Sequence, residues 1–252
     1  MNKKKILLIG ATGLLGDYFY KSLKKNKNIK LLICADNNLK NDLNKKRFFL
    51  DITNENEVKK FFELIKKKYG KIDHLINSAG LTSDLSIKQN LMIKDDFFNT
   101  RNWNKTLDVN LNGVFYCIKY FLKLHIDNAK IQKIITIGSI YGSNSPDHEI
   151  YKDEKFYTQI GYSASKSALI GMNKWISRKF SSKKIISNII SPAGVFNKKK
   201  INRNFMRKYL KKIPLGKPAA PDDIIGLVNF LISDQSNYIT GENIHIDGGF
   251  ST

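Results

Sequence analysis

Residues 5–16 read KILLIGATGLLG, an apolar run followed at once by a turn that carries Gly10, Gly13 and Gly16. Such a turn between a strand and a helix brings backbone N–H groups up to a pyrophosphate, and a helix beginning near Leu14 directs its positive end toward that anion. Side chains at the three glycines would obstruct the turn, the approach or the helix–strand packing. The pattern predicts a dinucleotide cradle, although a glycine triplet alone also fits an ordinary strand-to-helix turn.

Asp36 gives a second signal for the same cradle. It follows the next apolar run, residues 31–35, about 20 residues after Gly16, where a carboxylate can accept hydrogen bonds from the adenine ribose hydroxyls. A carboxylate there would repel a 2′-phosphate, and the adjoining Asn37 and Asn38 bring no positive charge. NAD(H) is therefore favoured over NADP(H), with a plain turn residue as the alternative interpretation of Asp36.

Short apolar strands alternate with longer amphipathic stretches along the whole chain. Candidate strands cover residues 5–9, 30–35, 72–77, 133–138, 185–190 and 243–246. Candidate helices cover residues 14–25, 55–69, 103–127, 162–180 and 221–233. Continuous apolar strands suit a parallel sheet covered on both faces, and the alternation indicates βαβ units. We therefore expect an α/β fold: a Rossmann-type doubly wound parallel sheet with helices on both faces, in a single domain over residues 1–252.

Composition narrows the class of protein. The chain has 252 residues, of which 42% are hydrophobic and 26% charged, and this balance excludes wholesale disorder and a collagen-like fibre. Its two cysteines, Cys34 and Cys117, exclude a disulfide framework and a cysteine-rich zinc site, and they fit a reducing compartment. Both fall in apolar patterns and are expected to pack as small hydrophobic side chains. The four histidines are scattered without metal-ligand spacing, so no metal site is predicted.

The net charge of +21 raises the alternative of a nucleic-acid or anionic-membrane partner. Of the 43 basic residues, however, only five are arginines, the residue preferred for bidentate phosphate contacts. Compositional drift toward lysine is the favoured interpretation, and no nucleic-acid partner is predicted. The N-terminus imitates a secretory signal, but glycines interrupt its apolar run, Asp17 follows, and no membrane-length stretch occurs. A soluble cytoplasmic protein without a membrane partner is expected.

Further motifs follow one another along the chain. They are Asp51 after a short apolar run, Asn77-Ser78-Ala79-Gly80, Asn110, Ser139 at a strand end, Tyr162-x-x-x-Lys166, and a tail from Tyr238-Ile239-Thr240-Gly241 to Asp247-Gly248-Gly249. Their order and spacing resemble the short-chain dehydrogenase/reductase family, in its compact NAD(P)-dependent branch, along essentially the whole chain. The resemblance implies an oxidoreductase that moves a hydride and a proton between an alcohol or ketone and a nicotinamide dinucleotide.

The resemblance also implies the site residues. The catalytic set would be Asn110, Ser139, Tyr162 and Lys166. The cofactor-binding set would be Gly10, Thr12, Gly13, Leu14, Leu15, Gly16, Asp36, Asp51, Ile52, Asn77, Ala79, Gly80, Tyr162, Lys166, Pro192, Gly194 and Val195. Tyr162 would act as acid and base, helped by the Lys166 ammonium one helical turn away, because a free phenol with a pKa near 10 is a poor base. Ser139 would donate to the substrate oxygen, and Asn110 would hold a water in a proton relay.

Three departures from the family pattern stand out. The glycine spacing is that of the extended branch, which modifies sugar nucleotides. The usual Pro-Gly is Pro192-Ala193-Gly194, and Asn197 replaces the usual threonine. Ser139 and Tyr162 are also unusually far apart. The insert between them carries several ionisable residues and is expected to lie beside the active site and shape the substrate pocket. These residues are Asp147, His148, Glu149, Asp153 and Glu154.

The segment 194–215 corresponds to the family's mobile substrate lid and is strongly basic. Its cations are Lys198, Lys199, Lys200, Arg203, Arg207, Lys208, Lys211 and Lys212. A solvated helix face in a lysine-rich protein is one interpretation. The other is a lid that closes over an anionic substrate such as a sugar phosphate or a nucleotide sugar.

Together these observations predict an NAD(H)-dependent oxidoreductase that interconverts an alcohol and a ketone, with an anionic sugar derivative as the candidate small-molecule substrate. A sugar-nucleotide epimerase or dehydratase with tightly bound NAD, and a non-catalytic NAD-binding protein, remain alternatives. Family members commonly join through the helices that here begin near Trp103 and Tyr162. A homodimer or homotetramer is therefore expected.

Overall fold

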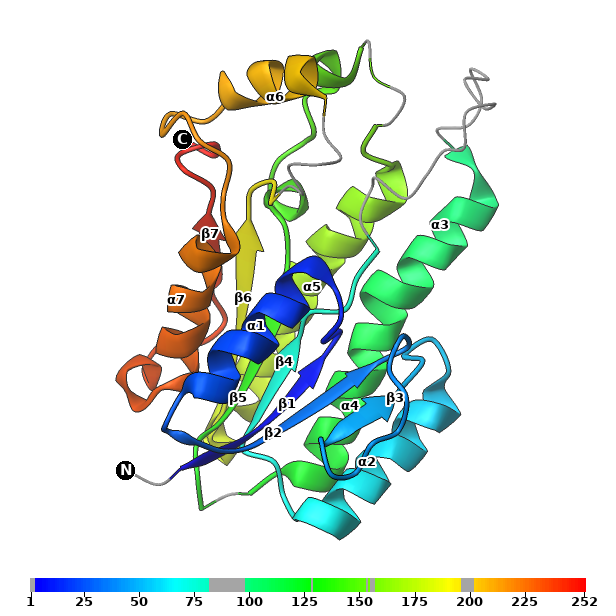
Figure 1. Cartoon of the computed structure of the whole chain (residues 1–252), viewed down its shortest axis with the longest axis vertical. Helices are drawn as coiled ribbons and strands as arrows, with labels where there is room; N and C mark the ends of the chain where they lie inside the picture. Colours follow the sequence, from blue (N-terminus) through cyan, green and yellow to red (C-terminus); the bar gives the residue numbers. More distant parts are fainter. Residues whose placement is uncertain (1–2, 82–97, 128, 153, 155–156, 196–201) are drawn as a thin grey trace.

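The sheet is built from seven parallel strands in the order β3-β2-β1-β4-β5-β6-β7 (Figure 1). The computed structural model describes residues 3–81, 98–127, 129–152, 154, 157–195 and 202–252. The strands are β1 Lys4–Ile9, β2 Ile29–Asp36, β3 Arg47–Phe49, β4 His74–Asn77, β5 Gln132–Ile137, β6 Ile185–Pro192 and β7 Asn243–Ile246. The first strand, β1, lies inside the sheet. The next two, β2 and β3, add on one side of it up to the edge, and β4 to β7 then add on the other side. This confirms the predicted doubly wound fold.

The reversal of strand order between β1 and β4 decides where a ligand can bind. Ile9, the last residue of β1, is paired with Ala35 of β2 on one side and with Asn77 of β4 on the other. The loops that leave β1 and β4 therefore diverge from the same edge of the sheet. In open parallel sheets a crevice at this point is the usual ligand site.

Helices cover both faces of the sheet. They are α1 Leu14–Lys25, α2 Glu55–Tyr69, α3 Thr100–Leu107, the π-helix η2 Asp108–Gly113, α4 Val114–His125, α5 Ile160–Phe180, α6 Arg203–Leu210 and α7 Pro221–Ile232. Short 3₁₀ turns are η3 Ile140–Gly142, η4 His148–Tyr151, η5 Ser181–Lys183 and η6 Asp234–Ser236. Within the described residues, none of the helices is both long and apolar enough to cross a membrane.

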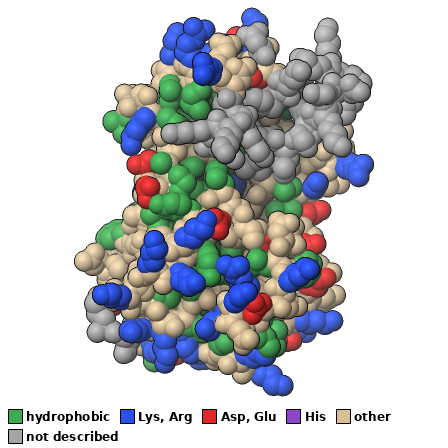
Figure 2. All heavy atoms as spheres, viewed as in Figure 1, with side chains coloured by type: hydrophobic (Ala, Val, Ile, Leu, Met, Phe, Trp, Pro, Cys, Tyr) green, Lys and Arg blue, Asp and Glu red, His purple; other side chains and the backbone are tan. Residues whose placement is uncertain are grey.

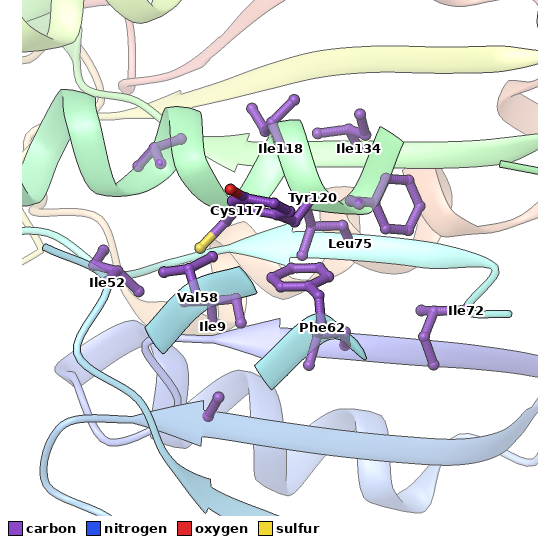
Figure 3. Close-up of a cluster of buried hydrophobic side chains, with 14 of the residues drawn as sticks. Ile9, Ile52, Val58, Phe62, Ile72, Leu75, Cys117, Ile118, Tyr120 and Ile134 are labelled. Atoms are coloured by element: carbon purple, nitrogen blue, oxygen red, sulfur yellow. The ribbon is translucent and has the colours of Figure 1, made fainter. Parts of the chain in front are cut away.

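Side chains of the strands alternate between two cores. Leu7 and Ile9 of β1 pack under α2, α4 and α5, in the cluster shown in Figure 3 around Phe62 and Cys117. Ile6 and Leu8 point to the other face, under α1 and α7. This period of two within an all-apolar strand is what a sheet buried on both faces requires.

A third buried cluster stands apart from the sheet. It consists of Ile150 and Tyr151 from the insert, Phe205 and Tyr209 of α6, and Ile213. Figure 1 shows α6 beyond the carboxyl end of β6, so this cluster lies over the edge from which the crevice opens. We refer to the insert and α6, joined by this cluster, as the cap.

Most predicted elements occur within a residue or two of their expected bounds. Three differences are informative. The short strand β3 was not predicted, because three residues give too little periodicity to detect. The expected helix 103–127 begins earlier and is interrupted by the π-helix η2. Helix α6 forms inside the segment predicted only as a lid. Cys34 and Cys117 are both buried thiols, as predicted.

Lysine and arginine side chains are scattered over the face drawn in Figure 2 and do not gather in one stripe. Exposed hydrophobic side chains lie among them on the same face. On this face, the distribution fits the interpretation of the positive charge as compositional.

Candidate active site

The three glycines of the first turn do different physical work. Gly10 has a φ of +82°, and a Cβ on it would lie 2.3 Å from the backbone N of Ala79. A Cβ on Gly16 would lie 1.8 Å from the carbonyl oxygen of Gly10. At Gly13, in contrast, a Cβ would meet only that same oxygen at 3.6 Å, an ordinary contact. Glycine is thus required at positions 10 and 16 because a side chain there would clash with the protein's own backbone. Gly13 instead lines the pocket, where the missing side chain leaves space for a ligand.

Asp36 is fixed against this turn. Its Oδ2 accepts a hydrogen bond from the Thr12 N–H at 3.0 Å, and its Oδ1 accepts one from the Asn38 N–H at 2.9 Å. The residue is buried at the end of β2. The Asn38 Nδ2 also donates to Oδ1, at 3.3 Å, and because a carboxylate offers about four lone-pair sites, these three bonds leave acceptor capacity on Oδ2 for a ligand hydroxyl. The donors that hold it are uncharged amides, which keeps the negative charge of Asp36 available to the ligand.

Asp51 and Ile52 lie on the loop that leaves β3. Leu50 donates its N–H to the Asp36 carbonyl at 3.1 Å, which brings Asp51 close to the end of β2. The Asp51 carboxylate accepts from the N–H and the hydroxyl of Thr53 and so shapes the entry to α2. Ile52 is buried, and its side chain fills the space where Gly113 has no Cβ. Neither side chain lines the main pocket.

Asn77 holds two strands together from inside the sheet. It is buried, and its Nδ2 donates to the Thr136 hydroxyl of β5 at 3.4 Å. Its Oδ1 has no hydrogen-bond partner among the described residues. The following Ala79 and Gly80 do reach the pocket wall.

The main pocket opens at the carboxyl ends of β1, β4, β5 and β6. Eleven predicted residues line it: Gly13, Leu14, Leu15, Ala79, Gly80, Ser139, Tyr162, Lys166, Pro192, Gly194 and Val195. The remaining predicted residues lie around this lining and not in it: Gly10, Thr12, Gly16, Asp36, Asp51, Ile52, Asn77 and Asn110. The structure therefore brings the glycine turn and the Tyr162–Lys166 pair to one continuous cavity.

Tyr162 and Lys166 project from the first turns of α5. The Lys166 Nζ lies 5.8 Å from the centroid of the Tyr162 ring, and it donates to the Ile137 carbonyl at 2.9 Å. The side chain is buried, and this burial lowers the pKa of the Lys166 ammonium to about 8. Burial thus makes the charged form of Lys166 unfavourable, and this ammonium lies beside the phenol of Tyr162.

Ser139 ends β5 on the same side of the pocket. Its Oγ accepts a hydrogen bond from the Tyr141 N–H at 3.2 Å and so caps the turn η3. This bond uses an oxygen lone pair and not the hydroxyl proton. The hydroxyl can therefore be oriented locally and still serve as a donor.

Asn110 occupies the π-helix η2. Its Oδ1 accepts from the Leu81 N–H at 2.7 Å, and its Nδ2 donates to the Leu81 carbonyl at 3.1 Å and to the Ser165 hydroxyl at 3.3 Å. A Cβ on Gly80 would lie 3.4 Å from the Asn110 Oδ1 and 3.6 Å from the Lys166 Nζ. Asn110 therefore fixes the backbone that borders Lys166. Single π turns inside α-helices are frequent at functional sites.

Four aromatic residues of the pocket were missed by the sequence prediction. They are Tyr141, Tyr151, Phe205 and Tyr209. The hydroxyls of Tyr141 and Tyr151 lie 3.3 Å apart, and Tyr151 also contacts the Thr158 hydroxyl at 2.8 Å. The available signal was the helical spacing of Phe205 and Tyr209, which the surrounding basic residues obscured.

The insert borders the pocket as expected, but its described charged residues do not line it. Asp147 forms an ion pair with Lys212 at 2.8 Å, and Glu154 accepts a hydrogen bond from Asn202. His148 and Glu149 are exposed, whereas Asp153 lies outside the described residues. The insert reaches the pocket through Ile140, Tyr141 and Tyr151. Its charges attach it to the segment around α6.

The arginines predicted to meet an anionic substrate are also outside the pocket. Arg203 and Arg207 are exposed on α6, and Arg207 donates to Asn204 on its own helix. The face that α6 turns inward carries Phe205 and Tyr209. Asn197 and Lys198 to Lys200 lie outside the described residues. Of the described lining residues, Lys166 alone carries a positive charge.

Comparison with known proteins places this geometry in a family. A family model described as enoyl-(acyl carrier protein) reductase matches residues 35–251, which is most of the chain. The chain belongs to the short-chain dehydrogenase/reductase family. It is accordingly an oxidoreductase of the class that interconverts alcohols and ketones with NAD or NADP.

Relatives within the short-chain dehydrogenase/reductase family carry one recurrent name. The 3-oxoacyl-[acyl-carrier-protein] reductase FabG of Buchnera aphidicola subsp. Baizongia pistaciae is 37% identical over 204 residues, covering 79% of this chain and 75% of that protein. FabG of Thermotoga maritima is 30% identical over 208 residues, covering 80% of this chain and 75% of that protein. These names describe reductases.

Solved structures of the family superpose over the full chain. A short-chain dehydrogenase from Leptospira borgpetersenii with bound NAD+ has a TM-score of 0.84 and 30% identity, covering 100% of this chain and 94% of that one. A gluconate 5-dehydrogenase from Burkholderia cenocepacia in complex with NADP and tartrate has a TM-score of 0.82 and 20% identity, covering 100% and 96%. At that lower identity the second likeness supports the fold alone.

Proposed function

We propose that this protein is an NAD(H)-dependent oxidoreductase in which Tyr162 exchanges the proton and the coenzyme exchanges the hydride with an alcohol or ketone. The observation that carries this proposal is the convergence of Tyr162, Lys166 and Ser139 in the cavity that also contains the glycine turn. A binding protein would have no need of a phenol beside a buried ammonium. The sugar-nucleotide epimerase finds no support among the relatives, which are named reductases.

The residues of the cradle fit a dinucleotide. Gly13 leaves open space where a side chain would intrude, and Asp36 keeps acceptor capacity at the end of β2. When bound, the coenzyme supplies the hydride. Lys166 would stabilise the phenolate of Tyr162, and Ser139 would donate to the substrate oxygen. Asn110 would act through the Leu81 backbone and Ser165, and so keep this side of the pocket in place.

The preference for NAD(H) rests on Asp36. Its carboxylate would accept a hydrogen bond from a ribose hydroxyl and repel a 2′-phosphate. The neighbour from Leptospira borgpetersenii, which contains bound NAD+, is consistent with this choice. The Asp36→Ala variant should bind NADH more weakly. The factor by which kcat/KM with NADH exceeds kcat/KM with NADPH should become smaller than in wild type. A wild-type enzyme that prefers NADPH would contradict the proposal.

The substrate we propose is compact and uncharged. The described pocket wall near Tyr162 is built from aromatic rings, and the arginines of α6 face solvent. Among the described lining residues the one cation is Lys166, which already serves Tyr162 in the proposed mechanism, so a phosphate or carboxylate packed against these rings would be poorly compensated for its desolvation. An anionic sugar derivative is for this reason a weaker candidate than a neutral ring or a short chain that packs on tyrosine.

Reduction of a 3-oxoacyl thioester is the second candidate function. It is favoured by the names of the relatives, several of which are 3-oxoacyl-[acyl-carrier-protein] reductases. A short acyl chain satisfies the same requirement for an uncharged body near Tyr162. The two candidates differ in whether a thioester must flank the ketone.

A matched panel of ketones separates these functions. Loss of NADH absorbance would be followed with neutral cyclic ketones and keto-sugars, with a 3-oxoacyl thioester of N-acetylcysteamine, and with phosphorylated keto-sugars. We expect turnover of a neutral member and little with the phosphorylated ones. If phosphorylated substrates were preferred, and Arg203→Gln with Arg207→Gln raised their KM, the anionic substrate would replace the uncharged one.

A further inference from the structure

The hydroxyl of Tyr209 joins the cap to the loop that follows β6. The backbone N–H of Gly194 donates to the Tyr209 Oη at an N···O distance of 2.6 Å. Gly194 lies in the loop and Tyr209 lies near the end of α6, so the bond connects two separate walls of the pocket. Nothing in the roles proposed above uses this bond.

Packing fixes the Tyr209 ring in place. It stacks on Phe205, with ring centroids 5.8 Å apart and an interplanar angle of 17°. It also stacks on Phe250, with centroids 6.1 Å apart and an angle of 28°. The residue is 2% exposed, and burial raises the pKa of its phenol to about 12. At neutral pH the group that accepts from Gly194 is therefore a neutral hydroxyl, held at a defined position by its ring.

The loop from Pro192 to Val195 lines the same cavity as Gly13 and Tyr162. Ala193 packs in one cluster with Tyr162, whereas Val195 packs in the cluster that holds Leu15, next to the glycine turn. We therefore expect a ligand that extends from the glycine turn to the phenol to contact this loop. The loop is held at Val195 by a bridge to Ala219 and at Gly194 by Tyr209.

We propose that Tyr209 is a positioning residue that couples the cap to the coenzyme-binding loop. Its ring forms part of the wall that a substrate would contact, while its hydroxyl fixes the loop that the coenzyme would contact. Because one residue joins the two walls, a coenzyme that orders the loop also orders the cap, and each ligand favours binding of the other. The inference rests on the proposed dinucleotide function.

The test removes the hydroxyl and keeps the ring. Dissociation constants for NADH, measured by its fluorescence without substrate, would be compared for wild type, Tyr209→Phe and Tyr120→Phe. Tyr120 is a matched control, because it is also buried and its hydroxyl donates to Glu55 at 2.9 Å between α2 and α4, away from the pocket. We expect Tyr209→Phe to weaken NADH binding about 5-fold, the factor of one ordinary hydrogen bond. We expect Tyr120→Phe to bind NADH as wild type does.

A second readout follows the cap itself. Arg203 and Arg207 are exposed sites for trypsin on α6. Saturating NADH should slow cleavage after these residues in wild type and in Tyr120→Phe, and slow it less in Tyr209→Phe, with the cut sites identified by mass spectrometry.

The outcomes separate this inference from the proposed function. If wild type fails to bind NADH, the proposed function fails and the coupling has no coenzyme to act through. If all three proteins bind NADH equally and α6 is protected equally, Tyr209 is only a structural contact and the inference is overturned. A lower melting temperature alone would be shared with Tyr120→Phe and would not support coupling.

Discussion

Lys166 is buried at the centre of the pocket and is charged only at a cost. Burial lowers its pKa to about 8, so in the folded protein it loses its proton above that pH, whereas in the unfolded chain it keeps the proton to about 10.4. Between these values the unfolded state binds more protons, and the contribution of Lys166 to the free energy of unfolding therefore rises with pH. Its charge, and the stabilisation of a phenolate at Tyr162, decline over the same interval.

Activity and stability should thus change in opposite directions above pH 8. We expect kcat/KM for ketone reduction to fall as Lys166 deprotonates, while its stability contribution grows. Paired pH profiles of rate and of urea unfolding would show this. The Lys166→Met variant should be inactive. Its free energy of unfolding should rise less between pH 8 and pH 10 than that of wild type, because the contribution of Lys166 is gone. A rate that stays level to pH 10 would contradict the role of Lys166.

Tyr162 offers a direct test of the proton transfer. Replacing it with phenylalanine removes the hydroxyl and leaves the ring over which the Lys166 Nζ lies. We expect kcat to fall roughly 10²–10⁴-fold, the usual contribution of a general acid–base group, with NADH affinity close to wild type. Normal turnover by this variant would exclude Tyr162 from the reaction.

The residues of the site differ in how far sequence could predict them. Tyr162 and Lys166 are four apart on one helix, so their proximity follows from helical geometry alone. The bond between Gly194 and Tyr209 could not be predicted, because it depends on the path of the intervening chain. The role expected of Asn110 was drawn from resemblance, and only the structure shows that its side chain bonds Leu81 in both directions.

At the scale of elements, α6 is held by a cluster of side chains that lies outside the sheet. Phe205, 1% exposed, packs with Tyr209 of its own helix and with Tyr151 of the insert. Replacing a buried phenylalanine with alanine costs about 3–5 kcal/mol, enough to open a short helix of eight residues. For Phe205→Ala we expect faster amide hydrogen exchange over residues 203–210 and a higher KM for the ketone, with little change in exchange of β1.

The ion pair at the cap gives the matching control. Lys212→Ala removes the partly exposed ion pair with Asp147 but leaves the Asp147 side chain in place as the cap of η4, and such pairs contribute about 0–1 kcal/mol. Exchange in α6 should therefore stay near wild type in this variant. If Phe205→Ala instead unfolded the whole protein, the cap would be part of the main core.

Element boundaries were predictable where local chemistry marks them. Helix α2 begins at Glu55 because the Asn54 side chain accepts from the N–H groups of Asn56 and Glu57. It ends before Gly70, whose φ of +73° favours glycine. The π-helix η2 carries no such mark, because one extra residue in a turn leaves the apolar periodicity nearly unchanged.

At the scale of the whole molecule, two buried histidines link stability to pH. His74 accepts from the Lys133 N–H and His125 from the Ile72 N–H, in each case through Nδ1. Burial, as the largest cause, lowers the pKa of His74 to about 3 and that of His125 to about 4. The unfolded chain protonates both near pH 6.5, so stability is present above that pH and is lost as pH falls below it.

As the pH is lowered, the free energy of unfolding should therefore begin to fall at a pH well above the range in which carboxylates titrate. Each histidine contributes a slope of about 1.4 kcal/mol per pH unit below pH 6.5. Urea unfolding at several pH values between 4.5 and 7 would measure it. His125→Asn, which retains an acceptor, should reduce the slope, and the exposed His148→Asn should not. Equal slopes in both variants would contradict this account.

The architecture was largely predictable because apolar strands and amphipathic helices alternate so regularly. The strand order was not, since pairing of β1 with both β2 and β4 depends on crossovers that no local pattern records. The homo-oligomer stays a prediction. Phe115 of α4 and Trp175 of α5 are exposed apolar side chains on the helices expected to form it.

The cap has its own small core, separate from the two cores that cover the sheet. Substitutions at its inward residues can therefore remodel the cavity without disturbing the strands that carry the reactive groups. New substrate preferences could arise in this lineage through a few changes in Tyr151 or Phe205. Such modularity makes the region around α6 the natural place to diversify in a directed-evolution library.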